Sequence, residues 1–481
     1  MAREPAWIGR RLAAGLALGA AALAACSGGG IGGSGSPAAG GGIGGSGAPL
    51  AKGAVDRFGS VFVAGVEFGT AAATILLNGA PAGEADLRTG MIVRVHGTIA
   101  PDGRTGTAAR IAYDATLAGP VELVDLAGGR CRILGRTVRM DAATTWHDAG
   151  PDLLKPGVIL ELCGHDEPDG SLRATYVRLR HPVFVPGAVE LFLRGTVQSL
   201  NPGAGTFRVG GQAVDFRSAV LPPGGLSDGL PVAVRSVDGV VGGFLIASRV
   251  EAESAESAAA DGCRAAREGV VASVSAGGGF VLDGLPARLG AGAVFERGDA
   301  GDLVPGVRVA VRGGWSGGVL VAEAVRFLGR EPLLLEAKVE SLDAAAGSIA
   351  VLGRVFRIDG HTRLMDERAE SGTRFRVDDL RIGDRVALRG DSGDGALAGQ
   401  IVRTNPSPAV AVEGVVEAAG AGSLIVVGVP VRLDAAPRGG GAFDSLASSG
   451  LDATALVGAT VRVEGLWDGT SVVATALALT Q

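Results

Sequence analysis

The sequence predicts an all-β protein, a tandem array of about six small OB-like barrels with five to six strands each. Two observations support this prediction. A glycine followed by alternating apolar residues, in the pattern Gly-x-x-apolar-x-apolar, recurs six times with unchanged internal spacing, and such alternation indicates a half-buried strand. A tight turn then follows every copy. The six copies begin at Gly90, Gly157, Gly229, Gly306, Gly383 and Gly458.

The turn after each of these strands predicts a hairpin. It reads Asp-Gly at 102–103, 169–170, 238–239, 394–395 and 468–469, and Ser-Gly-Gly at 316–318. Asp-Gly between alternating strands favours a type I′ turn, in which both central residues have positive φ. An alanine stands at a fixed site in each returning strand, which indicates close approach of a neighbouring strand. These alanines are Ala108, Ala174, Ala247, Ala322, Ala398 and Ala474.

Each repeat also opens in the same way, with Gly-x-Val at Gly53, Gly119, Gly195, Gly269 and Gly414, and with Ala337 as the variant. A second hairpin follows, turning near Gly65, Gly135, Gly211, Gly284, Gly353 and Gly428. So few short strands in one open sheet would leave one face wet and both edges unpaired. Closure into a small barrel solves both problems, so we expect an OB-like barrel, with a small sandwich or an SH3-like barrel as the alternative.

These patterns divide the chain into nine segments. We expect a signal peptide at 1–25, then Cys26 and a flexible Gly/Ser linker over 26–51. The barrel repeats are then predicted at 52–115, 116–187, 188–253, 265–330, 331–405 and 406–481, with a further linker at 254–264.

The first residues are typical of an exported protein. Arg3, Arg10 and Arg11 precede a short apolar run, and Leu23-Ala24-Ala25-Cys26 resembles a bacterial lipobox. That resemblance implies cleavage before Cys26 and acylation of its thiol and new amine, for example with palmitate. The alternative is an ordinary signal peptide that carries a cysteine. Ser27 after the cysteine suggests an outer-membrane lipoprotein of the cell envelope, on the periplasmic side or at the cell surface.

The repeats resemble a bacterial domain of unknown function that is found in lipoproteins and secreted proteins. The opening segment Phe58-Gly59-Ser60-Val61-Phe62-Val63-Ala64-Gly65-Val66-Glu67-Phe68 is typical of its first unit, and the similarity extends over 52–480. It departs most in the third repeat, where Ser236 replaces a glycine, and at a Gly-rich insert near 437–450. The resemblance implies an envelope location and a β-barrel, and it supplies no catalytic residue.

Three cysteines remain after Cys26. Cys131 aligns with inward apolar positions of the other repeats, so we expect it in a core. Cys163 aligns with outward polar positions, so we expect no disulfide between these two within one barrel. Cys163 and Cys263 are expected to be exposed, available to pair with each other or with another chain.

Two groups of residues are candidates for chemistry. The second repeat carries His147, Cys163, His165 and His181. Their spacing matches no zinc motif, so we expect surface histidines, with a metal-binding protein or metal-dependent enzyme as the alternative. In the fifth repeat, Asp359, Asp366 and Glu367 stand among Arg363, Arg368, Arg374 and Arg376, which predicts a solvated, salt-bridged loop. We therefore expect no catalytic residue, no metal site and no cofactor.

These observations predict a non-enzymatic binding or structural module. Its partners are expected to be the membrane, through the lipid anchor, and an envelope glycan, an envelope protein or a cation. The net charge of −6 and only two tyrosines argue against nucleic acid. We expect the six barrels to form an extended string of weak sites. Fold analogy places those sites on the barrel face and on the loop before each Gly-x-x-apolar strand.

Overall fold

The computed structural model describes residues 49–479 except 59, 126–127, 142, 149, 151–152, 254–258, 330–332, 369–374, 392–395, 421 and 434–452. The predicted signal peptide, Cys26, nearly all of the predicted linker and the Gly-rich insert near 437–450 lie outside the described residues. Within the described part, no helix combines the length and the apolar character needed to cross a membrane.

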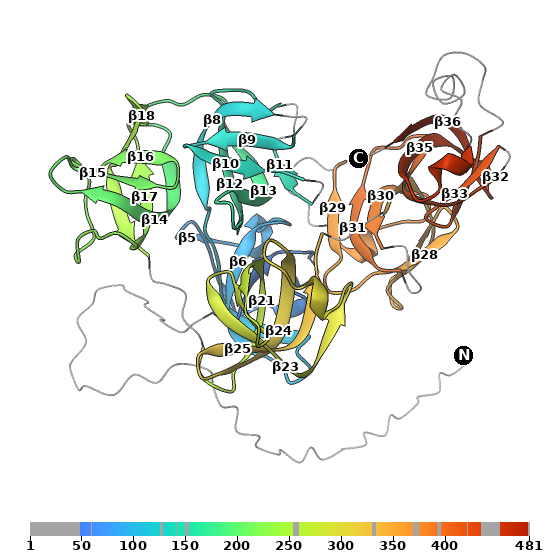
Figure 1. Ribbon diagram of the computed structural model, residues 1–481, viewed down its shortest axis with the longest axis horizontal. Coiled ribbons are helices and arrows are strands. Elements are labelled where there is room, and N and C mark those ends of the chain that lie inside the picture. Colours follow the sequence, from blue (N-terminus) through green and yellow to red (C-terminus); the bar gives the residue numbers. More distant parts are fainter. Residues whose placement is uncertain are drawn as a thin grey trace, which may run out of the picture.

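The described residues form six groups of strands, here called barrels 1 to 6 in chain order (Figure 1). Barrel 1 comprises β1 (Ala51–Ala54), β2 (Val61–Val63), β3 (Val66–Gly69), β4 (Thr74–Leu77), β5 (Ala80–Ala82), β6 (Ile92–Ile99) and β7 (Thr105–Tyr113), with the 3₁₀ turn η1 (Glu84–Asp86). Barrel 2 comprises β8 (Leu117–Asp125), β9 (Arg130–Ile133), β10 (Arg136–Arg139), β11 (Thr145–His147), β12 (Ile159–Asp166) and β13 (Leu172–His181). Barrel 3 comprises β14 (Leu191–Asn201), β15 (Thr206–Val209), β16 (Gln212–Asp215), β17 (Pro231–Ser236), β18 (Val240–Val241), β19 (Phe244–Ile246) and β20 (Arg249–Ala252).

The second half of the chain repeats the arrangement. Barrel 4 comprises β21 (Arg264–Val274), β22 (Gly279–Leu282), β23 (Leu285–Glu296), β24 (Arg308–Ser316) and β25 (Val319–Phe327), with η3 (Ala300–Asp302). Barrel 5 comprises β26 (Leu333–Asp343), β27 (Ser348–Val351), β28 (Arg354–Arg357), β29 (Arg363–Asp366), β30 (Arg385–Gly390) and β31 (Ala398–Arg403), with η4 (Val377–Asp379). Barrel 6 comprises β32 (Ala409–Gly420), β33 (Ser423–Val426), β34 (Val429–Arg432), β35 (Thr460–Trp467) and β36 (Val472–Leu479), with η5 (Ala453–Leu456).

In barrels 4 and 6 the first strand closes the barrel by pairing on both sides. In barrel 4 the strand order is β21-β22-β23-β25-β24, and β24 pairs back to β21. Barrel 6 has the same order, β32-β33-β34-β36-β35, and β35 pairs back to β32. The predicted all-β array of small five-stranded barrels is therefore confirmed.

A glycine–alanine pair lies at the same place in five barrels and explains the fixed alanine of the returning strand. Gly97 lies opposite Ala108 directly after a register shift in the β6–β7 ladder. A Cβ added to Gly97 would lie 1.9 Å from the carbonyl oxygen of Thr107, so no side chain fits there. The equivalent pairs are Gly164–Ala174, Gly313–Ala322, Gly390–Ala398 and Gly465–Ala474. The predicted close approach is confirmed, and it takes the form of a β-bulge.

The type I′ geometry was assigned to the wrong hairpin. At Asp102-Gly103 only the glycine has positive φ, because the Asp102 carboxylate accepts hydrogen bonds from the backbone N–H groups of Arg104 and Thr105 and forms an Asx turn. Paired positive φ values occur instead at the mid-unit turn, as at Ala64 (48°) and Gly65 (77°). The same paired values recur at 134–135, 283–284, 352–353 and 427–428. In the hairpin after the Gly-x-x-apolar strand they occur in barrel 4, at Gly317 (60°) and Gly318 (76°).

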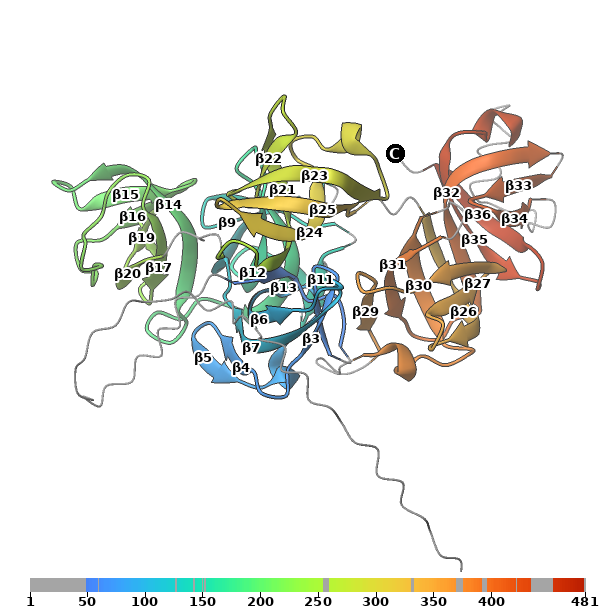
Figure 2. The same cartoon turned by 90° about the horizontal axis from the view of Figure 1, so that it is seen from below.

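The barrels associate in three pairs, each sharing one continuous sheet. Barrels 2 and 3 join through β8 and β14, and barrels 5 and 6 through β26 and β32. Barrels 1 and 4 join through the parallel strands β1 and β21, although two other barrels separate them in the sequence. Figure 2 shows barrels 3 and 6 at opposite ends with the 1–4 pair between them.

Outward side chains are buried between barrels, so the expected extended string of barrels is wrong. One apolar cluster combines the core of barrel 1 with Cys163 and Tyr176 of barrel 2, Phe192 of barrel 3 and Ala266 of barrel 4. Other clusters run through barrels 2 and 3 and through barrels 5 and 6. Barrels 1 to 4 therefore pack into one body, and barrel 5 joins it through polar contacts such as the hydrogen bond from Arg363 to the carbonyl of Ala143 in barrel 2.

The cysteines illustrate the consequence of this packing. Cys131 lies in the core, as predicted. Cys163 does point out of its own barrel, yet it is 1% exposed because barrel 1 covers it, and its sulfur accepts a hydrogen bond from the Ile92 N–H at 3.2 Å. Cys263 is 3% exposed and packs into the barrel 4 core. The predicted exposure of Cys163 and Cys263 is therefore wrong.

Candidate functional site

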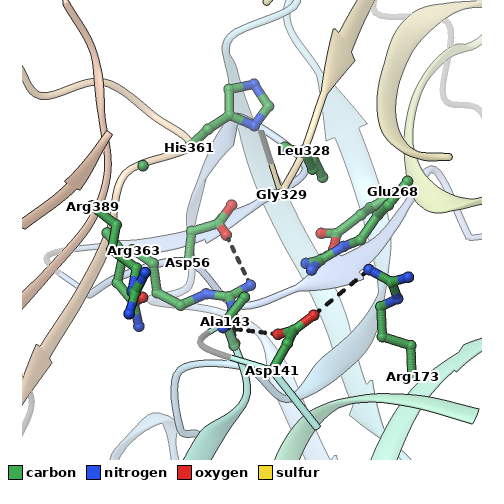
Figure 3. A pocket seen from close by; sticks show the side chains of 13 residues that line it. Asp56, Asp141, Ala143, Arg173, Glu268, Leu328, Gly329, His361, Arg363 and Arg389 are labelled. Atoms are coloured by element: carbon green, nitrogen blue, oxygen red, sulfur yellow. Dashed lines mark hydrogen bonds and ion pairs between the residues drawn. The ribbon is translucent and has the colours of Figure 1, made fainter. Parts of the chain in front are cut away.

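A polar cavity of about 240 Å³ lies where barrels 1, 2, 4 and 5 meet (Figure 3). Most of its wall is charged, which is unusual for space enclosed between packed domains. The lining residues are Asp56, Asp141, Ala143, Arg173, Glu268, Arg308, Leu328, Gly329, His361, Arg363, Arg389, Gly399 and Gln400. Because each barrel supplies part of the wall, the cavity exists only in the assembled chain.

Glu268, on β21, is the buried anion of this junction, with 2% exposure. Its carboxylate accepts hydrogen bonds from the Ala54 N–H at 3.0 Å and from Arg308 Nε at 2.9 Å, and His165 Nε2 lies 3.3 Å away. Burial alone would raise the pKa of Glu268, but Arg308 and His165 hold that pKa well below its ordinary value. One carboxylate therefore connects barrels 1, 2 and 4.

Asp56, just after β1, is the second buried carboxylate, with 6% exposure. It forms an ion pair with Arg363 of barrel 5, whose Nη2 lies 3.7 Å from Oδ1, which is longer than a good ion-paired hydrogen bond. Burial and then the charge of Glu268 raise the pKa of Asp56 to about 8, against the opposing effect of Arg363. Asp56 is therefore largely protonated at neutral pH.

Barrel 5 is positioned against barrel 1 by β29 and the segment that precedes it. The backbone N–H of Leu364 donates to the carbonyl of Asp56 at 3.1 Å, and the His361 ring occupies the space that a Cβ on Gly65 would fill. Desolvation of that ring, followed by the charge of Arg326, lowers the pKa of His361 to about 3. His361 is therefore neutral in the folded protein at ordinary pH.

These pKa values predict a pH dependence of stability that Asp56→Asn removes. Native Asp56 keeps its proton up to about pH 8, whereas the unfolded chain releases it near the ordinary value of 3.8. The stability contributed by Asp56 is therefore complete below pH 4 and is lost as pH rises to 8, by up to about 1.4 kcal/mol per unit. His361 acts in the opposite sense below pH 6.5, since only the unfolded chain binds its proton there.

Between pH 6.5 and 8 the Asp56 effect is therefore unopposed by His361. We expect the free energy of unfolding of the parent protein to fall across this interval, and that of Asp56→Asn to fall less. Urea unfolding at several pH values measures both curves. Parallel curves for the two proteins would show that Asp56 is ionised in the folded state.

The histidines of the second repeat are each held by a different neighbour. His147 stacks on Tyr176 with ring centroids 6.2 Å apart, and the His181 side chain turns back onto the carbonyl of Val183 in its own turn. His165 is 2% exposed beside Glu268, so its predicted place on the surface is wrong. Burial raises the pKa of the Cys163 thiol to about 11, which keeps it protonated. Among the residues that the structure describes, no three His, Cys, Asp or Glu side chains gather as metal ligands would.

The charged segment of the fifth repeat is only partly the solvated loop that the sequence predicts. Arg363 is 6% exposed and donates to the carbonyl of Ala143 in barrel 2. Asp359 pairs with Arg326 of barrel 4, whose side chain is 3% exposed. The prediction is wrong for these residues because other barrels cover them. Asp366 and Glu367 lie outside the cavity lining, and Asp366 pairs with Arg403.

The site residues on first strands were missed because they have no distinctive sequence signal. Glu268 directly precedes the opening Gly-x-Val of its repeat, where other repeats have Lys52, Arg194, Glu336 and Glu413. A charged residue is ordinary at this outward position of a first strand, so Glu268 does not stand out in the sequence. The expected loop before the Gly-x-x-apolar strand does contribute to the cavity, through Asp141 of barrel 2 and His361 of barrel 5.

A second, larger cleft of about 920 Å³ lies between barrels 1, 2, 3 and 4. Its charged lining residues include ion pairs that bridge barrels. Lys52 Nζ of barrel 1 lies 2.6 Å from Asp283 of barrel 4, and Arg194 Nη2 of barrel 3 lies 3.6 Å from Asp114, which follows the last strand of barrel 1. The backbone of Gly195 and the exposed side chain of Thr196 form part of the wall. This cleft is therefore polar, open and bordered by side chains already held in place.

Comparison with known proteins gives a family for most of these barrels. The solved structure named drosophila Unr CSD456 is 13% identical over 37% of this chain and 78% of its own, with a TM-score of 0.15, and carries no argument here. No curated protein matches the chain. Residues 52–112, 118–178, 268–326, 336–402 and 413–477 match the family described as Domain of unknown function (DUF5666). Barrel 3 lies outside these ranges. Because the five copies cover more than half of the chain, the protein belongs to the DUF5666 family.

Proposed function

We propose that this protein is a lipid-anchored, non-enzymatic binding scaffold of the bacterial envelope. In this proposal Cys26 carries the acyl chains, the Gly-rich segment after it is the tether, and the six barrels are the binding body. More than one acyl chain is needed for stable anchoring, and the lipobox provides for several. The anchoring places the barrels at the outer membrane, on its periplasmic side or at the cell surface.

One observation carries the binding part of the proposal: a cleft of about 920 Å³ lies between two pairs of barrels, 1–4 and 2–3, and backbone pairing fixes each pair before any ligand arrives. A preformed site loses less conformational entropy on binding than one that must be assembled. The cleft is within the size range of ligand sites. Its wall of paired charges, backbone and Thr196 suits a polar chain rich in hydroxyl groups, so we propose an envelope glycan as the ligand.

The test is a thermal unfolding screen of the full chain in detergent micelles. Peptidoglycan fragments, envelope polysaccharides and divalent cations are the probes. We expect a glycan to raise the unfolding midpoint of the parent protein, since ligands that bind only the folded state stabilise it. Thr196→Trp fills the cleft and should abolish that shift, whereas Thr475→Trp, at an exposed site in barrel 6, should preserve it.

Anchoring is measured on the same proteins in cells. We expect a fatty-acid label on the parent protein and on Cys131→Ala, and no label on Cys26→Ala. A labelled Cys26→Ala protein would contradict the anchor. An absence of any shift with all glycan probes would contradict glycan binding, whatever the labelling result.

A further inference from the structure

We infer that the junction cavity binds a small oxyanion, phosphate or carboxylate, between Arg363 and Arg389 of barrel 5. This inference rests on the proposed binding function but concerns a different cavity and a different ligand from the glycan cleft. It follows from the arrangement of three side chains in one row, and from guanidinium groups there whose donors are only partly satisfied by the described residues.

The row crosses three neighbouring strands of barrel 5. Gln400 on β31 lies in register with Arg363 on β29 and with Arg389 on β30. Residues in register across a sheet point to the same face, and neighbouring strands lie about 4.8 Å apart. All three residues line the junction cavity, so the two arginines flank the Gln400 amide. Figure 3 shows both arginines on the side of the cavity opposite Glu268 and Arg173.

The other two arginines of the cavity wall are fully engaged. Arg308 donates to Glu268 through Nε at 2.9 Å and also through Nη2. Arg173 lies 2.6 Å from Glu167 and also approaches Asp141 at 3.6 Å. Each of these two guanidinium groups is therefore paired with a nearby carboxylate.

Arg363 and Arg389 are different. Arg363 uses Nη1 on the carbonyl of Ala143, while its buried Nε has no hydrogen-bond partner among the described residues. Arg389 is half-buried, and the described part of the chain places no hydrogen-bond or ion-pair partner on it. A guanidinium donor left unpaired in a buried site is unfavourable, and a ligand that accepts from it restores that free energy.

Asp56 does not neutralise this pair of arginines. Its carboxyl is 3.7 Å from Arg363, and its raised pKa keeps it largely protonated at neutral pH. Arg389 therefore has no carboxylate partner among the described residues and Arg363 has only the distant Asp56, while the other carboxylates of the lining, Glu268 and Asp141, are paired with Arg308 and Arg173. A guanidinium matches the two oxygens of a carboxylate or phosphate through paired hydrogen bonds. The volume of about 240 Å³ is far above the ~10–15 Å³ that one water needs, so an oxyanion fits beside the row.

Titration calorimetry on the full chain in detergent tests the inference, with inorganic phosphate in one arm and succinate in the other. The variants are Arg389→Met and Arg288→Met. The first removes the unpartnered guanidinium and retains much of the aliphatic side chain; the second removes an exposed arginine of barrel 4 that is not part of the lining. We expect one anion per chain to bind, Arg389→Met to weaken it about tenfold or more, and Arg288→Met to leave it unchanged.

Binding of phosphate alone or of succinate alone supports the inference and identifies the ligand class. No binding of either anion at millimolar concentration overturns it, and so does equal binding by the parent and Arg389→Met. Unfolding midpoints of the variants without ligand, equal to that of the parent, exclude loss of the fold as the cause. These results are independent of the glycan screen, because Thr196→Trp leaves the junction cavity intact and Arg389→Met leaves the cleft intact.

Discussion

Replacing Glu268 by glutamine is expected to lower the free energy of unfolding by about 3–5 kcal/mol. The substitution keeps the shape of the side chain and removes the charge that faces Arg308, whose own exposure is 8%. Removing one partner of a buried ion pair is strongly destabilising because the other charge stays buried without compensation. Glu268 also accepts the Ala54 N–H and contacts His165, so barrels 1 and 2 lose a contact as well. Chemical denaturation followed by tryptophan fluorescence measures the loss.

The matched control is Glu323→Gln in the same barrel. Glu323 pairs with Arg264 at 3.0 Å, but the two side chains are 58% and 32% exposed. Surface pairs of this kind contribute about 0–1 kcal/mol. If both glutamine substitutions lowered the free energy of unfolding by the same small amount, the Glu268 junction would not be what holds barrels 1, 2 and 4 together.

Phe192→Ala is expected to destabilise the protein by about 3–5 kcal/mol, the usual range for removing a buried phenylalanine. Phe192 lies on β14 between Leu191 and Leu193, which point into the shared core of barrels 2 and 3. Phe192 points the other way, into the cluster that contains the core of barrel 1, and is 5% exposed. The guanidinium carbons of Arg194 and Arg235 lie 5.1 and 5.0 Å from its ring centroid. The cavity left by alanine would therefore open at the contact between barrels.

Phe244→Ala is the control for this variant. Phe244 belongs to the same barrel but is 39% exposed on β19. We expect it to lower the free energy of unfolding by less than about 1 kcal/mol. Equal losses for Phe192→Ala and Phe244→Ala would mean that barrel 3 folds without support from barrel 1.

Some of the barrel packing was visible in the sequence without being recognised. Strict alternation predicts a polar residue between Leu191 and Leu193, and Phe192 breaks that alternation. Cys163 is likewise an apolar residue at an outward position of its strand. An apolar residue at an outward position is a signal for burial against another domain. Reading such positions as exposed assumed that each barrel is surrounded by water.

The charged residues of the junction give no comparable signal. Glu268, Asp56 and Arg363 belong to residue types that are common on any outward face, and their spacing in the sequence is irregular. Their burial depends on contacts between different barrels, such as the contact of Glu268 with His165, 103 positions away in the sequence. The free energy of a buried charge is set by its surroundings rather than by its identity, so composition and spacing do not reveal it.

The sequence by itself determined the barrel. Alternating residues, the glycine of each turn and the Gly–Ala bulge act within one repeat, so each copy of the pattern specifies the same closed set of strands. Only the tertiary structure decided which barrels pair and where the cavities lie. The β1–β21 ladder that joins barrel 1 to barrel 4 is a backbone contact, with Ala51 beside Ala266. Nearly every residue type has the same backbone donor and acceptor, so such a contact cannot be predicted from the identity of the residues. The junction forms because four barrels, each specified locally, bring Asp56, Glu268, His165 and Arg363 together from separate parts of the chain.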